Sequence, residues 1–422
     1  MPVRSEPRHQ PTRISSPAPA LLRAVREAAL NGCNVSMGSR RLESVHEFYR
    51  YPARFSPGFA RAVVQAFTRP GDIVLDPFVG GGTTLVESRL LGRPSIGADI
   101  SALAAFVSRA KTTLPSADDL VALAAWRSVL EDVLRLSGRT RRPNKWDEQG
   151  YLRGLGGNAT WRIRDLLVRA LDALSSVSNG PPELLGRCAI LRTAQWALDM
   201  RRVVPTVEEF RAALIGSTSQ FINVARNQAD AVRHADFTYP TSLPRTTVLQ
   251  QALPGLSTHP AVSNIGQPSL VITSPPYPGV YVLYHRWKLQ GRKEIAAPFW
   301  LADSPDGHGM AHYTMSARAR QTLDLYFEQI QNAFADLVQM AGNDTWIVQL
   351  VGFSNVSSQL SRYLGLLADV GLKEVRFPEL STASDGRLWR NVPSRRWWVT
   401  ATSRNQVAAH TAQEVVLIHR PG

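Results

Sequence analysis

The segment Asp76-Pro77-Phe78-Val79-Gly80-Gly81-Gly82-Thr83-Thr84 decides the fold of this chain. A short apolar run at residues 73–75 precedes it and predicts a strand, and residues 83–91 after it predict a helix that Gly92 ends. Glycines between a strand and a helix permit positive φ angles and let the backbone approach a ligand closely. No Gly-Lys-Ser/Thr triplet follows, so the loop is not a P-loop.

A second strand is predicted at PSIGADI, residues 94–100, with Asp99 at its end. A carboxylate in that position can accept hydrogen bonds from both hydroxyls of a ribose. The alternation of short apolar strands with helices predicts an α/β fold with a parallel sheet. An exposed loop aspartate is the alternative interpretation of Asp99.

Further strand patterns bring the predicted total to seven. They occur at TTVLQ (246–250), SLVITS (269–274), TWIVQLVGF (345–353), KEVRF (373–377) and EVVLIHR (414–420). Helical patterns cover residues 18–30, 316–340 and 357–371. Between the second and third strands, residues 117–232 are almost wholly helical in period.

The predicted organisation has four parts. Residues 1–17 form a flexible arm, 18–112 the first part of a catalytic domain, 113–240 a helical insert, and 241–422 the second part of the catalytic domain. We see no internal repeat of fixed period.

A second motif, Thr273-Ser274-Pro275-Pro276-Tyr277, follows an apolar strand. Ligands of open α/β sheets bind at the carboxyl ends of strands, so the motif is well placed for a site. The two prolines fix φ and hold the backbone carbonyls in place, and the tyrosine adds a flat face. The alternative is a proline-rich turn that only caps the strand.

Upstream of the glycine loop lies the aromatic segment HEFYRYPARFSP, residues 46–57. Such a run either packs in a core or contacts a ligand, and His46 by itself is expected to be structural.

Together, DPFVGGGTT and TSPPY resemble the amino-methylating DNA methyltransferases, which modify cytosine N4 or adenine N6 with S-adenosylmethionine. The Ser form of the second motif is typical of the cytosine-N4 members, and the order of the motifs excludes the permuted class in which SPPY comes first. The resemblance implies a Rossmann-like seven-stranded methyltransferase sheet, here with a large helical insert. It covers residues 46–99 and 270–298 most strongly.

The resemblance also assigns roles to residues. The cofactor-binding set would be Tyr51, Pro52, Phe55, Asp76, Pro77, Phe78, Gly80, Gly82, Thr83, Thr84 and Asp99, and the catalytic set Ser274, Pro275, Pro276 and Tyr277. Ser274 and the Pro275 carbonyl would accept the amine protons, and Tyr277 would stack on a base flipped out of the duplex. One departure is that Gln250 and Gln251 occupy the place where the family often has an acidic residue.

The charge favours a polyanionic partner. The chain has 422 residues, 44% of them hydrophobic and 19% charged, and a formal net charge of +14 that is nearly all arginine. Double-stranded DNA is the expected partner, and the helical insert the expected target-recognition region. Segments that mix basic and aromatic residues are expected to contact DNA, the alternative being solvated loops; their residues are Arg141, Arg142, Arg286, Arg395, Arg396 and Trp397.

The two cysteines, Cys33 and Cys188, exclude a disulfide scaffold and a four-thiolate zinc site, so no metal is expected. Neither lies next to a proline, which argues against cytosine-C5 methylation through a thiolate. No apolar run reaches the roughly 18 residues of a membrane span and no signal core is seen, so we expect no membrane association and a cytoplasmic location.

The leading prediction is a site-specific DNA methyltransferase acting on cytosine N4, as in restriction–modification, where a cognate restriction endonuclease would be a further partner. Alternatives are an adenine-N6 DNA enzyme, an RNA or protein-glutamine methyltransferase, and a non-catalytic DNA-binding protein. The sequence does not define the oligomeric state.

Overall fold

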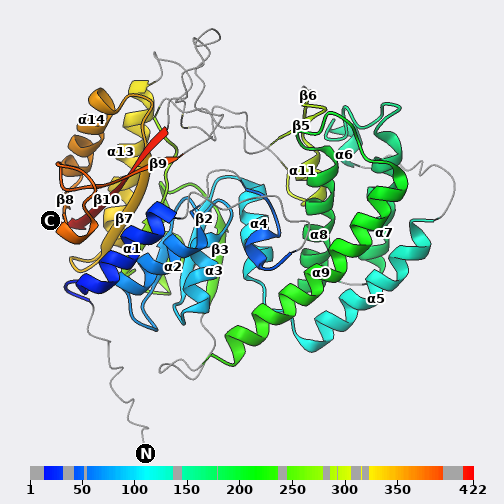
Figure 1. The fold of residues 1–422 in the computed structure, drawn as a ribbon, viewed down its shortest axis with the longest axis horizontal. Coiled ribbons are helices and arrows are strands. Elements are labelled where there is room, and N and C mark those ends of the chain that lie inside the picture. Colours follow the sequence, from blue (N-terminus) through cyan, green and yellow to red (C-terminus); the bar gives the residue numbers. More distant parts are fainter. Residues whose placement is uncertain are drawn as a thin grey trace, which may run out of the picture.

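The computed structural model of the chain is shown in Figure 1. It describes residues 14–31, 42–51, 55–135, 145–177, 179–235, 245–278, 286–291, 293–305, 315, 323–392 and 412–422.

An eight-stranded sheet forms the centre of the catalytic part, in the order β3-β2-β1-β4-β7-β10-β8, with β9 paired to another stretch of β10. Its strands are β1 (Val74–Asp76), β2 (Ser95–Asp99), β3 (Thr246–Gln250), β4 (Leu270–Thr273), β7 (Trp346–Gly352), β8 (Leu372–Glu374), β9 (Leu388–Val392) and β10 (Ala412–Pro421). The five strands from β3 to β7 are parallel, and β10 runs antiparallel to its neighbours. The predicted Rossmann-like α/β class is therefore confirmed. All seven predicted strands are present in this sheet, and β9 is its one addition among the described residues; the strands of a separate two-stranded sheet, β5 (Trp287–Leu289) and β6 (Lys293–Ile295), were not predicted either.

Side chains alternate between the two faces along each strand, and helices bury both faces. Val74, Leu270 and Ile272 pack on one face with α1 and α2, while Leu75 and Val271 pack on the other with α13 and α14. The helices and short turns around the sheet are α1 (Pro19–Asn31), η2 (Val45–Glu47), α2 (Pro57–Phe67), α3 (Thr83–Leu90), α4 (Ala102–Thr112), α10 (Pro260–Ser263), α13 (Leu323–Met340), α14 (Val356–Asp369) and η4 (Pro378–Leu380).

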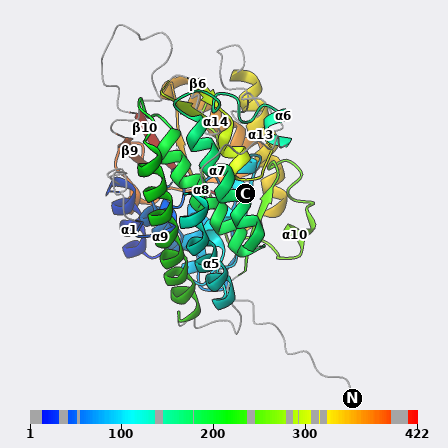
Figure 2. The ribbon, with the colours of Figure 1, turned by 90° about the vertical axis from the view of Figure 1, so that its right-hand side faces the viewer.

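A helical body lies beside the sheet, on the side of α4 (Figures 1 and 2). It contains α5 (Ala117–Val133), α6 (Lys145–Glu148), α7 (Trp161–Val177), α8 (Pro181–Leu198) and α9 (Val207–Arg233). Its apolar core is continuous with α4 and with Tyr49 and Tyr51 of the aromatic segment. The helical region predicted from the sequence is thus tied directly to the segment expected to bind the cofactor.

A later part of the chain joins this helical body. β5 (Trp287–Leu289), β6 (Lys293–Ile295) and α11 (Ala297–Leu301) pack in the same core, although their residues follow the TSPPY motif. The Trp287 indole N–H donates to the Tyr49 hydroxyl at 3.0 Å. Among the described helices, none has both the length and the apolarity that crossing a bilayer requires.

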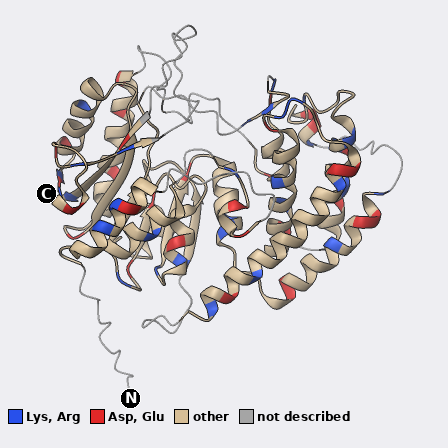
Figure 3. Cartoon of the chain, in the orientation of Figure 1, with Lys and Arg blue, Asp and Glu red and all other residues tan. Residues whose placement is uncertain are grey.

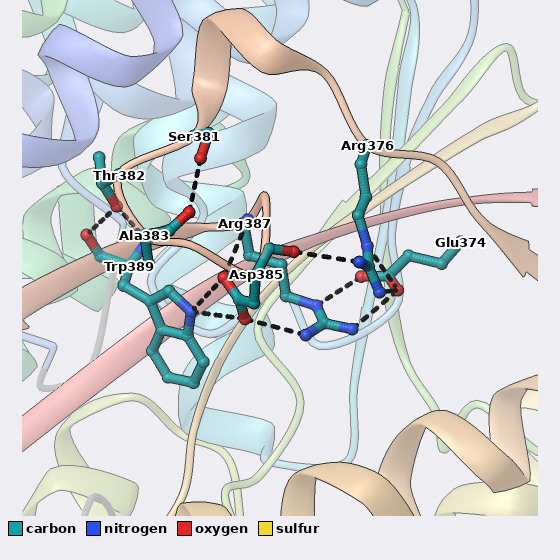
Figure 4. Close-up of polar contacts among 8 residues, drawn as sticks. All are labelled: Glu374, Arg376, Ser381, Thr382, Ala383, Asp385, Arg387 and Trp389. Atoms are coloured by element: carbon teal, nitrogen blue, oxygen red, sulfur yellow. Dashed lines mark hydrogen bonds and ion pairs between the residues drawn. The ribbon is translucent and has the colours of Figure 1, made fainter.

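The outer edge of the sheet is held by the polar network in Figure 4. Arg387 donates to Glu374 at 2.6 and 2.9 Å and to Asp385 at 2.9 Å, and only 10% of its side chain is exposed. Arg376 bonds the same Glu374 but is 49% exposed. Burial raises the pKa of Glu374, but hydrogen bonds and charge from Arg387 and Arg376 outweigh it, and the net pKa is lowered. The carboxylate is therefore ionised in the folded protein near neutral pH.

We expect Arg387→Met to lower the free energy of unfolding by about 2 kcal/mol at pH 7, because two carboxylates lose charge-assisted bonds. Arg376→Met, the exposed control on the same carboxylate, should cost less than about 1 kcal/mol. The lowered pKa of Glu374 gives its full stabilisation above the ordinary value near 4.5, so the Arg387 effect should shrink as the pH falls from that value toward the lowered pKa. Urea unfolding at several pH values measures this. Equal losses for the two variants would contradict it.

Candidate active site

The two sequence motifs meet at the point where the strand order reverses. Strands β2 and β3 lie on one side of β1, whereas β4 pairs with the other side of β1 and is followed in the sheet by β7. Asp76 ends β1 and Thr273 ends β4, and the Thr273 hydroxyl donates to Oδ1 of Asp76 at 2.9 Å. Ligands of open α/β sheets bind outside the carboxyl ends of strands at such a switch point.

The glycine loop is tied to Asp99 at the end of β2. The Gly80 N–H donates to Oδ2 of Asp99 at 2.9 Å, and the Ser101 N–H donates to Oδ1 at 2.8 Å. Gly80 and Gly82 have φ angles of 48° and 75°, which residues with a Cβ rarely adopt. Each Asp99 oxygen retains a lone pair for a further hydrogen bond.

Helix α4 holds the loop from behind, which the sequence did not indicate. The Ser108 hydroxyl donates to the Gly80 carbonyl at 3.0 Å, and Nζ of Lys111 donates to the Gly81 carbonyl at 2.9 Å. Lys111 is fully buried and also reaches the Tyr49 carbonyl at 3.5 Å. The one available signal was that the chain has few lysines and one of them falls in a helix whose first six residues are all apolar.

Burial changes the acidity of both loop carboxyls. It raises the pKa of Asp76 to about 7, against the lowering effect of the hydrogen bonds that Asp76 accepts. It raises the pKa of Asp99 to about 6, against the bonds from Ser101 and Gly80. Both groups therefore change charge close to neutral pH, which is characteristic of functional sites.

The TSPPY motif lies at the end of β4, and its Ser274 and Tyr277 side chains reach residues of β7 and β10. The Ser274 Oγ lies 2.9 Å from the Leu350 carbonyl and 3.1 Å from the Tyr277 hydroxyl. Tyr277 is 8% exposed, and its hydroxyl donates to Oε1 of Glu414 at 3.1 Å. The stacking role of Tyr277 stays a prediction, because the ring lies within the core cluster in this conformation.

The backbone of the motif is also bound, because the Tyr326 hydroxyl donates to the Pro276 carbonyl at 2.7 Å. Sequence reasoning missed Tyr326 and Glu414, which lie in a helix and a strand far along the chain.

Not every predicted residue lies at the loop. Tyr51 does, since a Cβ built on Gly81 would fall 2.9 Å from its Cβ. Phe55 instead packs on Phe59, in the core between α2 and the sheet. His46 pairs with Glu87 at 2.7 Å, in line with the structural role expected for it.

The predicted cofactor-binding residues Pro77, Phe78, Thr83 and Thr84 follow β1 in the loop and in the first turn of α3. Gln250, at the end of β3, is the register partner of Asp99.

Several predicted residues lie outside the described part of the chain, namely Pro52, Arg141, Arg142, Arg395, Arg396 and Trp397. Arg286 is described and exposed. Basic and acidic residues are intermixed over the described elements (Figure 3). These residues nearly balance in charge, so most of the net charge of +14 belongs to arginines outside them. No cluster of three or more metal-ligating side chains occurs among the described residues.

The strand order and the paired motifs define a Rossmann-like α/β protein with a candidate ligand site at the switch point. Residues 29–105 match the family model described as DNA methylase. The type II methyltransferase M.MjaII of Methanocaldococcus jannaschii is 37% identical over 17% of this chain and 13% of its own length. The type II methyltransferase M.BsoBI of Geobacillus stearothermophilus is 39% identical over 16% and 13%. These matches confirm the resemblance to the amino-methylating DNA methyltransferases and imply S-adenosylmethionine as methyl donor.

The matches are local. The chain spans only 13% of the length of both type II relatives. The tRNA (guanine(10)-N2)-dimethyltransferase of Methanocaldococcus jannaschii is 49% identical over 12% of this chain and 15% of its own length. An rRNA methyltransferase of Streptomyces viridochromogenes, aligned over 92% of this chain and 93% of its own, has a TM-score of 0.31 and 11% identity. The fold assignment rests on the strand order of the chain itself.

We expect Gly81→Ala to destabilise the protein by about 1–3 kcal/mol, because the new Cβ would lie 2.9 Å from the Cβ of Tyr51. Gly58→Ala is the matched control, since a Cβ there meets nothing within 4 Å. Thermal unfolding of the two variants compares them. A neutral Gly81→Ala would show that Tyr51 does not lie against the loop.

Proposed function

We propose that this protein is an S-adenosylmethionine-dependent DNA methyltransferase that methylates the N4 amine of cytosine. The observation that carries the proposal is the hydrogen bond from Thr273 to Asp76, which joins the glycine loop to the TSPPY motif at the switch point. A cofactor loop and an amine-binding motif in direct contact are what methyl transfer requires, because donor and acceptor must lie in line.

The residues present fit the cofactor. The Thr83 hydroxyl, 3% exposed at the start of α3, has no hydrogen-bond partner among the described residues and is available to a ligand. Asp99 keeps lone pairs for the ribose hydroxyls, and the glycines admit a ligand close to the backbone. The bound cofactor would supply an electrophilic methyl group on a sulfonium. Tyr51 and Asp76 would border its methionine part.

Ser274 and Pro275 would then handle the amine. Cytosine N4 is a poor nucleophile because its lone pair is delocalised into the ring. Acceptors for both N–H groups, the Ser274 hydroxyl and the Pro275 carbonyl, would draw the nitrogen toward tetrahedral geometry. Ser274 is half-buried at the end of β4, so it is open to a base on one side and bonded to protein on the other.

DNA is the proposed substrate, because two of the relatives are type II methyltransferases. The helical body of α5 to α9 would serve target recognition, and the arginine-rich segments, including Arg286, would contact phosphates. Adenine N6 is the closest alternative target. A second candidate is an exocyclic amine of RNA, favoured by the similarity to a tRNA (guanine(10)-N2)-dimethyltransferase. A restriction endonuclease as partner is proposed on the same ground as the DNA substrate.

Nucleoside mass spectrometry tests the function. The purified protein is incubated with methyl-labelled S-adenosylmethionine and either plasmid DNA or total RNA, and Ser274→Ala serves as the control that binds cofactor without turnover. We expect labelled N4-methylcytosine in DNA from the wild type alone. Labelled N6-methyladenine without N4-methylcytosine, or label in RNA only, would replace the proposed target.

We expect the affinity for S-adenosylmethionine to rise about tenfold from pH 5 to pH 8, because ionised carboxylates bind ribose hydroxyls and the sulfonium better than carboxylic acids do. The raised pKa values of Asp99, about 6, and Asp76, about 7, leave both groups largely protonated at pH 5 and ionised at pH 8. Asp99→Asn should weaken cofactor binding. It should also remove the change in affinity near pH 6 and keep the change near pH 7 that belongs to Asp76. Isothermal titration calorimetry at five pH values measures this. A flat profile for the wild type would contradict the assigned roles.

A further inference from the structure

A charged pair is buried behind the TSPPY motif. Glu414 of β10 has no exposed surface, and Arg390 of β9 is 4% exposed. Oε2 of Glu414 accepts from the Arg390 guanidinium at 2.6 and 2.7 Å, while Oε1 accepts from the Tyr277 hydroxyl at 3.1 Å. The two residues are direct cross-strand partners, so strand pairing itself sets their contact.

Through Tyr277 this pair reaches Ser274. The Tyr277 oxygen lies 3.1 Å from the Ser274 Oγ, which is also 2.9 Å from the Leu350 carbonyl. Three contacts thus share the two hydroxyl protons of Ser274 and Tyr277. A carbonyl and a carboxylate only accept, so the tyrosine proton goes to Glu414 and the serine proton goes inward, to Tyr277 or Leu350. The lone pairs of Ser274 are left for a substrate amine.

We propose that Glu414, held by Arg390, is the positioning residue that orients these hydroxyls and receives the proton displaced from the amine during methyl transfer. This inference rests on the proposed function. It adds an end point for the proton, which the TSPPY motif by itself does not provide.

The step balances. As the nitrogen lone pair forms the new N–C bond, the electrons of the S–C bond remain on sulfur, and the amine must lose a proton. That proton passes to the Ser274 Oγ, the serine proton to the Tyr277 Oη, and the tyrosine proton to Oε1 of Glu414. The carboxylate becomes a carboxylic acid and, after product release, returns its proton through Tyr277 to Ser274, which is half-buried and so reaches solvent.

A purely structural role explains the pair less well. Burying two charges is costly, and apolar residues of similar volume commonly stabilise a core at least as well. Arg390 binds Glu414 through Oε2 and leaves Oε1 to Tyr277, so the pair both fixes the carboxylate and presents one oxygen to the hydroxyl chain.

The test measures single-turnover methyl transfer to DNA at saturating cofactor and DNA. Tyr277→Phe breaks the hydroxyl chain, and Glu414→Gln combined with Arg390→Met removes the acceptor without leaving an unpaired buried charge. Each should lower the rate by about 100-fold. The cofactor dissociation constant should stay within about twofold of the wild type. The triple variant should be no slower than Tyr277→Phe, since both changes interrupt one chain.

Two controls match these changes elsewhere in the fold. Tyr363→Phe removes another fully buried tyrosine hydroxyl, which bonds Gln349 at 2.6 Å without touching Ser274. Glu374→Gln with Arg387→Met removes an ion pair from the neighbouring edge. Both controls should transfer methyl groups at close to the wild-type rate below their melting temperatures.

An active wild type with rates within twofold in Tyr277→Phe and in the charge-pair variant would overturn this inference and leave the proposed function standing. Equal losses in the Tyr277→Phe and Tyr363→Phe variants would overturn it as well, since that result indicates general loosening of the core. Absence of transfer to DNA by the wild type would overturn the proposed function, and this assignment with it.

Discussion

The parallel pairing of β1 with β4 is the constraint on which the site depends. Val74 pairs with Leu270 and Leu75 with Val271, although the whole helical body lies between them in sequence. Closing so long a loop costs entropy that local structure does not recover. The cost is offset by burial on both faces of the sheet, where these strand residues pack against helices from both halves of the chain. The same pairing brings Asp76 to Thr273, so the contact between the two motifs depends on the pairing of these two strands.

Much of this arrangement could be predicted from sequence, because the strands β1, β2 and β4 are short apolar runs and the glycines follow directly after β1. Helix α4 was not predicted. It is buried on nearly every side, so its sequence lacks the amphipathic period that marks a surface helix. β9 was missed for a related reason. Its sequence LWRNV carries a central arginine, and that residue can be buried only because Glu414 lies opposite on β10. Such compensation between distant residues is invisible in a single local pattern.

The distribution of charge also reflects pairing between residues that are distant in the sequence. The described residues nearly balance, and the charges inside them are used locally: Lys111 on the glycine loop, Glu87 between His46 and Arg61, and Arg390 on Glu414. The net charge of +14 therefore says little about the folded core. Most of that charge lies in the segments outside the described residues, which are rich in arginine.

These buried polar groups surround the switch point from different parts of the chain. Lys111 reaches the loop from α4, Tyr326 reaches the Pro276 carbonyl from α13, and Glu414 reaches Tyr277 from β10. Each departs from the rule that charged or polar groups stay outside, and each contacts one of the two motifs. Departures from local rules concentrate where function requires geometry that packing alone does not supply. Because β10 lies between β7 and β8, the hydroxyl pair of Ser274 and Tyr277 acquires its acceptor only when this strand has entered the sheet. The hydrogen bonds around the TSPPY motif are therefore completed by a strand far along the chain.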